Sequence, residues 1–133
     1  MNLRYSILLV LAASLTAHGA ETFDARAERA RALEDSPSGK VYQDSMWPLV
    51  KPFLEALIKQ CSANDAKRDL KSFVWVATLT SEGKLADAQV QPETDIAKCF
   101  ARGMEQAPFP KTPQEFAEDG LPLTFNMRLH PMN

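Results

Sequence analysis

The chain has 133 residues, 24% of them charged, and its formal net charge at pH 7 is −2. This length is typical of one domain around a single modest core, so a two-domain protein is not expected. The 15 basic residues are interleaved with 17 acidic ones. Because binding to a phosphate backbone needs a basic stripe, the composition argues against a nucleic-acid partner.

Residues 1–19 are typical of a secretory signal peptide. Arg4 precedes an apolar run over residues 7–15, and small residues follow at Ala17 and Gly19. A membrane anchor is the alternative, but a helix needs about 20 apolar residues to cross a bilayer and this run is about half that length. We therefore expect cleavage near Gly19 or Ala20 and a periplasmic product without a membrane span.

Residues 20–43 are predicted to form an N-terminal arm and linker, followed by one domain over residues 44–133. Ala, Arg and Glu favour a helix in the first part of this arm, but Phe23 and Leu33 are its only large apolar residues up to Lys40. The run from Asp35 to Gly39 combines Ser, Pro and Gly, which is typical of a chain break.

A first core helix is predicted to begin near Asp44 or Ser45, either of which can cap free backbone amides, with Pro48 in its first turn. Its buried stripe should repeat every three or four residues. The stripe consists of Trp47, Val50, Leu54, Leu57, Ile58 and Cys61. Trp47 could instead form a platform for a ligand, but we favour the core position. Residues 62–71 are mostly polar and predict a loop.

Residues 73–91 predict a β-hairpin. From Phe73 to Thr80, large apolar and β-branched residues suit a pleated surface, with the odd-numbered side chains on one face and the even-numbered ones on the other. The turn is Ser81-Glu82-Gly83, in which Gly83 can adopt the left-handed conformation that short hairpin loops need. In the return strand, Leu85 is out of phase with Ala88 and Val90. We therefore expect a β-bulge near Ala86-Asp87.

A second helix and a last strand are predicted after the hairpin. Residues 92–95 offer turn and cap chemistry for a helix over residues 96–106. One face of this helix carries Ile96, Cys99, Phe100, Gly103 and Met104. Prolines exclude a regular helix over residues 107–113. In the predicted strand over residues 121–129, Leu123, Phe125, Met127 and Leu129 alternate with Thr124, Asn126 and Arg128, which indicates one core face and one hydrated face.

The two cysteines, Cys61 and Cys99, are predicted to form a structural disulfide. An even count in an exported chain favours this reading, and both residues lie on inward helical stripes. Metal binding and redox chemistry are the alternatives. Zinc needs three or four ligands, and beyond the predicted signal peptide the only histidine is His130, so we expect no metal site.

The element order is helix, strand, strand, helix, strand. It predicts an α+β fold of two layers, with the helices on one face of a three-stranded antiparallel sheet. The chain resembles the C-terminal domains of TonB, TolA and the related AgmX/PglI group over Trp47 to Leu129. The resemblance is carried by Gly83-Lys84-Leu85 and Val90 in the hairpin, by Cys99-Phe100, by Phe109-Pro110 and by the closing strand.

This resemblance implies protein binding rather than catalysis. In that family the TonB members pair the sheet edge with a short extended segment of an outer-membrane receptor. The resemblance places the last strand at a sheet edge, where Thr124, Asn126 and Arg128 would flank an incoming strand. An ordinary solvated edge guarded by Arg128 is the alternative.

The sequence therefore predicts a free-standing periplasmic domain, without a cofactor, that binds a periplasmic or outer-membrane protein. Self-association into a dimer is left open. The alternative is a small periplasmic inhibitor or immunity-type protein, which fits the size, export and disulfide nearly as well. An enzyme is not expected, because no nucleophile with a base, no carboxylate pair and no metal site is assembled.

Overall fold

The computed structural model describes residues 21–63 and 70–129. The predicted signal peptide, residues 64–69 of the predicted loop and His130 lie outside these residues. The elements are α1 (Phe23–Glu34), α2 (Pro37–Ala63), β1 (Phe73–Leu79), β2 (Leu85–Gln91), α3 (Asp95–Gly103) and β3 (Leu121–Met127), with short 3₁₀ turns at Met104–Gln106 and Gln114–Phe116. The strands form one antiparallel sheet in the order β2-β1-β3. The predicted α+β class and the order helix, strand, strand, helix, strand are confirmed from α2 onward.

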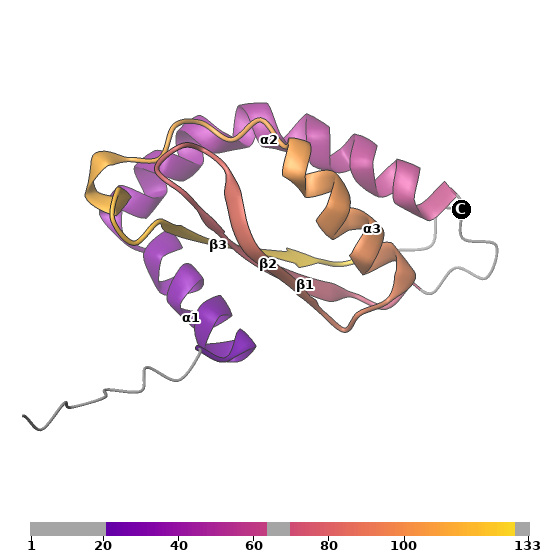
Figure 1. Cartoon of the computed structure of the whole chain (residues 1–133). Helices are drawn as coiled ribbons and strands as arrows, with labels where there is room; N and C mark the ends of the chain where they lie inside the picture. Colours follow the sequence, from indigo (N-terminus) through magenta and orange to yellow (C-terminus); the bar gives the residue numbers. More distant parts are fainter. Residues whose placement is uncertain (1–20, 64–69, 130–133) are drawn as a thin grey trace, which may run out of the picture.

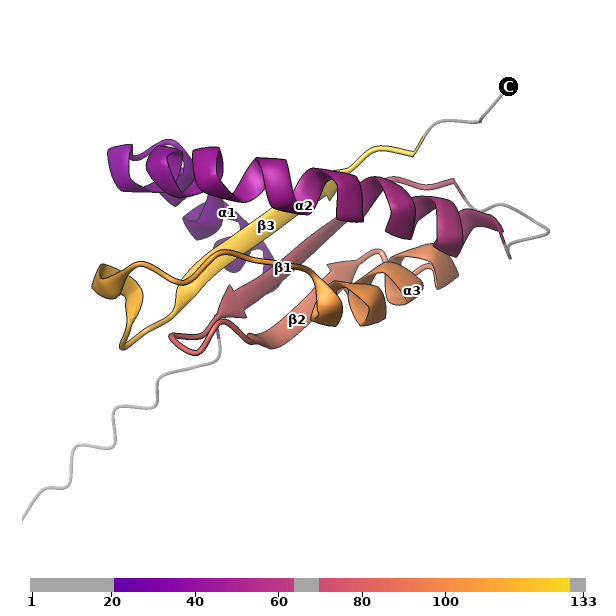
Figure 2. The same ribbon diagram turned by 90° about the horizontal axis from the view of Figure 1, so that it is seen from above.

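The main core lies between the sheet and the helices α2 and α3, which cover the same face (Figures 1 and 2). The side chains of β1 that point to these helices are Phe73, Trp75, Ala77 and Leu79, and all four are buried, as the alternation predicted. The ring of Trp75 stacks on Phe125 at a centroid distance of 5.4 Å and meets the edge of Phe100 at 6.3 Å. Aromatic contacts therefore join β1 to both β3 and α3.

Helix α2 begins at Pro37, so the prediction of a start near Asp44 or Ser45 is wrong. The Ser36 hydroxyl accepts a hydrogen bond from the Gly39 amide at 3.1 Å, and the Ser36 carbonyl accepts one from the Lys40 amide at 3.0 Å. Pro37 stands in the first turn, where its missing amide donor costs nothing. The Ser-Pro pair that suggested a chain break is therefore a helix cap, and the described part of the predicted arm and linker forms α1 and the beginning of α2.

The early start of α2 also changes which residues are buried. The buried residues of α2 are Gly39, Tyr42, Met46, Val50, Leu54, Leu57 and Cys61. Spacings of four run back from Val50 through Met46 to Tyr42, so Met46 occupies the core position predicted for Trp47. Trp47 is 40% exposed, and the predicted core placement of this residue is wrong.

Helix α1 packs against β3 and β1 on the face opposite to α2 and α3 (Figure 2). Ala27 and Ala30 are buried on α1, and Val76 and Thr124 are buried on the facing strands. This face was predicted to be hydrated along the last strand. Alanine side chains let a helix approach a sheet closely without a stripe of large apolar residues, so α1 adds a layer that the hydrophobic pattern did not predict.

The predicted β-bulge in the hairpin is confirmed. Between two successive paired positions, β1 advances from Val76 to Thr78 while β2 runs from Gln89 to Ala86, so β2 contains one extra residue. Asp87 lies in this segment with φ of 52°. The extra residue brings Leu85 and Val90, which are an odd number of positions apart, to the core side of the sheet.

The bulge also anchors α1. The guanidinium of Arg26 donates hydrogen bonds to the Asp87 carbonyl at 2.7 Å and to the Gln89 side-chain oxygen at 3.0 Å. Because Arg26 belongs to α1 and its partners belong to β2, α1 is tied to one outer strand of the sheet while it packs on the other.

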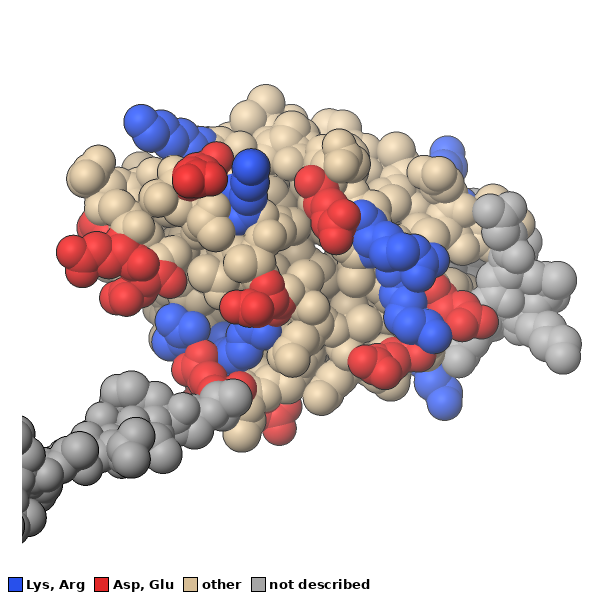
Figure 3. Space-filling view, in the orientation of Figure 1, with Lys and Arg blue, Asp and Glu red and all other residues tan. Residues whose placement is uncertain are grey.

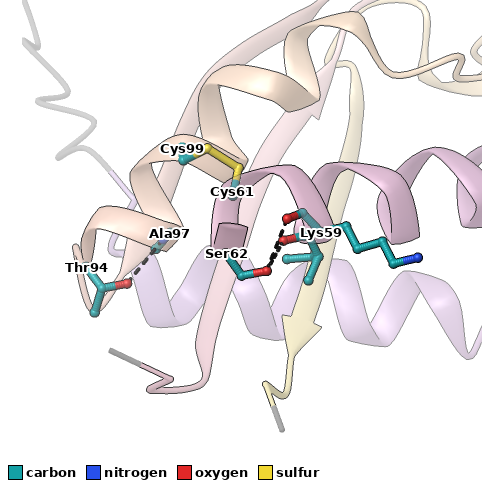
Figure 4. The surroundings of a disulfide bond; sticks show 7 residues. Lys59, Cys61, Ser62, Thr94, Ala97 and Cys99 are labelled. Carbon is teal, nitrogen blue, oxygen red and sulfur yellow. Dashed lines mark hydrogen bonds between the residues drawn. A yellow bond between two sulfur atoms is a disulfide. The ribbon is translucent and has the colours of Figure 1, made fainter. Parts of the chain in front are cut away.

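The predicted disulfide between Cys61 and Cys99 is confirmed, with a Cα–Cα distance of 5.7 Å (Figure 4). It joins the C-terminal part of α2 to α3, whose first turn is capped by the Thr94 hydroxyl accepting from the Ala97 amide at 3.1 Å. The two helices also approach closely at Gly103, where an added Cβ would lie 2.2 Å from a methyl carbon of Leu57. The bridge and the glycine thus hold α2 and α3 together over the core.

We predict that the disulfide contributes much of the stability of this small domain. It joins residues 38 positions apart, for which the loop-entropy model gives about 4 kcal/mol. The double substitution Cys61→Ala and Cys99→Ala should therefore lower the free energy of unfolding, measured in urea, by about 3–4 kcal/mol. The parent protein measured with a reductant is the matched control and should show a similar loss. A double variant as stable as the oxidised parent would contradict the prediction.

Candidate functional site

Strand β3 forms one edge of the sheet because it pairs with β1 alone (Figure 1). This placement agrees with the expectation from the sequence. The opposite edge is β2, whose bulge is held by Arg26 of α1. Of the two edges, β3 is the one whose pairing with β1 is regular over its whole length.

One side-chain hydrogen bond indicates which backbone groups of β3 face outward from the sheet. The Thr124 hydroxyl donates to the Trp75 carbonyl at 3.1 Å, so that carbonyl points toward β3. Trp75 is paired with Phe125, which is therefore a position where the two strands exchange hydrogen bonds. Positions of this kind alternate along an antiparallel pair. The backbone groups of Pro122, Thr124 and Asn126 consequently point away from β1.

The proline supports this assignment. Pro122 has no amide hydrogen, and within a sheet proline is accommodated where that amide would face away from the partner strand. The open edge therefore offers two amide donors, those of Thr124 and Asn126, together with carbonyl acceptors. Among the described residues, neither amide donates a backbone hydrogen bond outside the helices and strands.

A groove of about 490 Å³ runs along this open edge, between β3 and α2. Its lining on α2 extends from Gly39 to Ile58, and on β3 from Leu121 to Met127. The corner between α1 and α2 completes it with Leu33 and Glu34. Most of the lining side chains are apolar, so the groove combines a row of backbone hydrogen-bonding groups with an apolar wall.

The apolar wall is fixed by aromatic contacts. Trp47 meets the ring of Phe125 edge to face, with centroids 5.7 Å apart. Phe125 also stacks with Trp75 at 5.4 Å and with Phe109 at 6.4 Å. Trp47 therefore contacts a cluster of aromatic rings while remaining 40% exposed. The role of ligand platform, which the sequence made the less favoured interpretation, fits this position of Trp47.

The three residues predicted to flank a partner have different environments. Thr124 is only 8% exposed, because its hydroxyl binds the Trp75 carbonyl and α1 covers that face. It can therefore offer a partner its backbone but not its side chain. Asn126 is exposed and lines the groove. Arg128 is exposed, follows the end of β3 and is not part of the groove lining.

Charged side chains are few in the groove: Glu34, Lys51 and Glu55. Lys51 and Glu55 stand one turn apart on α2, where opposite charges offset one another. Glu34 ends α1 and is half-buried. Its pKa is raised by loss of water on burial and by the neighbouring charge of Asp35, and Arg31 opposes this rise. Sequence reasoning did not single out Glu34, because only the α1–α2 corner brings it to the groove.

Tyr42 stands at the same end of α2. Its hydroxyl donates a hydrogen bond to the Pro110 carbonyl at 3.0 Å, which ties α2 to the segment that leads into β3. Burial raises the pKa of Tyr42 to about 12.

Other kinds of site find no support in the part of the chain that the structure describes. Within residues 21–63 and 70–129, no three His, Cys, Asp or Glu side chains gather as a metal site requires. No helix in the same residues has the length and apolar character needed to cross a membrane. On the face drawn in Figure 3, acidic and basic side chains are interspersed, which does not suit a phosphate backbone.

Comparisons with known proteins returned no match to a protein-family model, to a curated protein or to a solved structure.

We predict that Tyr42 ionises at about pH 12 rather than near its ordinary value of about 10. Because the pKa of Tyr42 is higher in the folded state than in the unfolded state, the neutral phenol stabilises the folded protein. This stabilisation is complete below pH 10 and is lost as the pH rises toward 12. In a chain that starts at Glu21, Tyr42 is the only tyrosine, so absorbance at 295 nm reports it alone. Tyr42→Phe is the blank. A midpoint near pH 10 in the folded protein would contradict the prediction.

Proposed function

We propose that this domain binds partner proteins by accepting an extended segment along the open edge of β3. The observation that carries the proposal is the row of outward-facing backbone groups of β3 inside an apolar groove. An added strand would satisfy the amides of Thr124 and Asn126, and alternate side chains of that strand would enter the groove toward α2.

An ordinary solvated edge is the competing interpretation. Such edges are usually protected by charged residues, prolines or bulges. Here Pro122 protects the beginning of β3 and Arg128 follows its end, but between them the edge faces apolar side chains such as Met46 and Trp47. An apolar groove beside unpaired amides favours a bound strand over bulk water.

The groove is also better suited to a peptide than to a compact small molecule. Its lining follows the whole of β3, and its polar groups are spaced along a strand rather than converging on one point. Recognition by main-chain hydrogen bonds gives affinity, while the pockets for side chains give selectivity. The proposal agrees with the resemblance to the C-terminal domains of TonB and TolA.

We further propose that the protein is exported to the periplasm and that its partner is a periplasmic or outer-membrane protein. The Cys61–Cys99 disulfide supports an oxidising compartment. The apolar run over residues 7–15, followed by Ala17 and Gly19, supports a cleaved signal peptide.

Export predicts a defined mature chain. When the full sequence is expressed in a Gram-negative host, protein from the periplasmic fraction should begin at Ala20 or Glu21 and contain no free thiol. N-terminal sequencing and thiol titration measure both. Recovery of the uncleaved chain from the inner-membrane fraction would overturn the proposal of a periplasmic product.

Edge pairing predicts that a proline at Asn126 weakens binding. Peptides selected by the oxidised mature domain from a displayed random-sequence library provide ligands for a fluorescence-anisotropy assay. Asn126→Pro should raise the Kd at least about tenfold, because it removes an outward amide donor and adds bulk at the edge. Asn126→Ala keeps the backbone donor and should change the Kd less than about threefold, as expected for loss of a peripheral side chain.

The proline variant is a fair test because β3 already contains Pro122 at a position with the same outward orientation. Circular dichroism and thermal unfolding establish that both variants fold. Equal affinity of the two folded variants would contradict edge pairing, as would a library from which the parent selects no peptide.

A further inference from the structure

We propose that the groove selects extended segments that carry a lysine or arginine together with a large apolar residue, and that Glu34 receives the cationic side chain. The inference rests on the proposed function, because it assigns a sequence preference to the strand that adds to β3. The apolar residue would pack on the α2 wall near Met46 and Trp47.

Glu34 is held in place by a tight corner. An added Cβ at Gly39 would lie 1.8 Å from the Leu33 carbonyl oxygen, so only glycine lets α2 start this close to the end of α1. The Ser36 hydroxyl donates to that same carbonyl at 2.6 Å. Figure 2 places this corner beyond the β3 side of the sheet, away from β2, and both Leu33 and Glu34 line the groove.

The corner carries two carboxylates, Glu34 and Asp35, against one neighbouring cation, Arg31. Glu34 is the last residue of α1, where the aligned peptide dipoles of the helix add negative partial charge, and Asp35 follows it directly. Arg31, on the last turn of α1, offsets part of this negative charge but is not part of the groove lining. The ion pairs of the described residues join Arg29 to Glu21 and Lys98 to Asp95, and neither includes Glu34.

The other charges of the groove do not compete for this role. Lys51 and Glu55 are exposed neighbours on one turn of α2, and together they add no net charge. Glu34 is therefore the position at which the groove differs most from a neutral apolar surface. A cationic side chain placed there gains a partner that is partly shielded from water, whereas an acidic one would be repelled.

The test compares the peptides that three forms of the oxidised mature domain select from one displayed random-sequence library. The forms are the parent, Glu34→Gln, and Glu55→Gln as the matched control in the same groove. The parent and Glu55→Gln should enrich lysine and arginine about fivefold at one position, the size expected of a partly screened ion pair. Glu34→Gln should lose this enrichment and still select apolar residues.

A selected peptide then provides a double-mutant cycle. Replacing its basic residue by norleucine should raise the Kd for the parent about fivefold and leave the Kd for Glu34→Gln nearly unchanged. The selected peptides could bind Asn126→Pro more weakly than the parent, as an edge strand should, and yet show no preference for lysine or arginine. That result would overturn this inference and leave the edge-binding function intact. An enrichment lost equally in Glu55→Gln would also overturn it. Selection of no peptide would overturn both proposals.

Discussion

The antiparallel pairing of β3 with β1 is the constraint on which both the core and the groove depend. The pairing of Trp75 with Phe125 stacks two aromatic rings inside the domain and turns the backbone of Asn126 outward. In a strand, the side-chain direction and the hydrogen-bond direction alternate with the same period. A slip of one residue would therefore move Phe125 out of the core and reverse the amides that face the groove.

The helices turn this exposed edge into a sheltered one. α2 lies over one face of the sheet and α1 under the other, and the short turn at Asp35 and Ser36 joins them beyond the edge (Figures 1 and 2). The disulfide fixes the far part of α2 to α3. Both ends of α2 are thus tied to neighbouring segments, and if a partner strand binds as proposed, a groove formed in advance lowers the entropy lost on binding.

Local sequence patterns predicted the elements whose determinants are local. The hairpin with its bulge follows from alternation and the phase of Leu85, and the cap of α3 follows from Thr94. The pairing of Cys61 with Cys99 follows from two inward helical stripes. These features were predictable because each depends on residues close together in the chain or on a single pair of cysteines.

The features that the sequence did not predict depend on tertiary packing. Ser36-Pro37 suits a chain break and a helix start equally well. Met46 and Trp47 both lie within one turn of Val50, so helical spacing alone did not decide which of them is buried. Alanines gave no apolar stripe that would predict the packing of α1. The candidate site was predicted in part, since the strand and Asn126 were identified, but the groove and Glu34 arise only where α1, α2 and β3 meet.

The central claim is that a partner adds to the sheet as a strand along β3, and amide hydrogen exchange with and without a selected peptide tests it most directly. The account predicts that binding slows exchange at Thr124 and Asn126, whose amides face the groove. Exchange at Phe125 should change little, because that amide already donates to β1. Slowed exchange confined to β2 or α2, with Thr124 and Asn126 unchanged, would contradict the account.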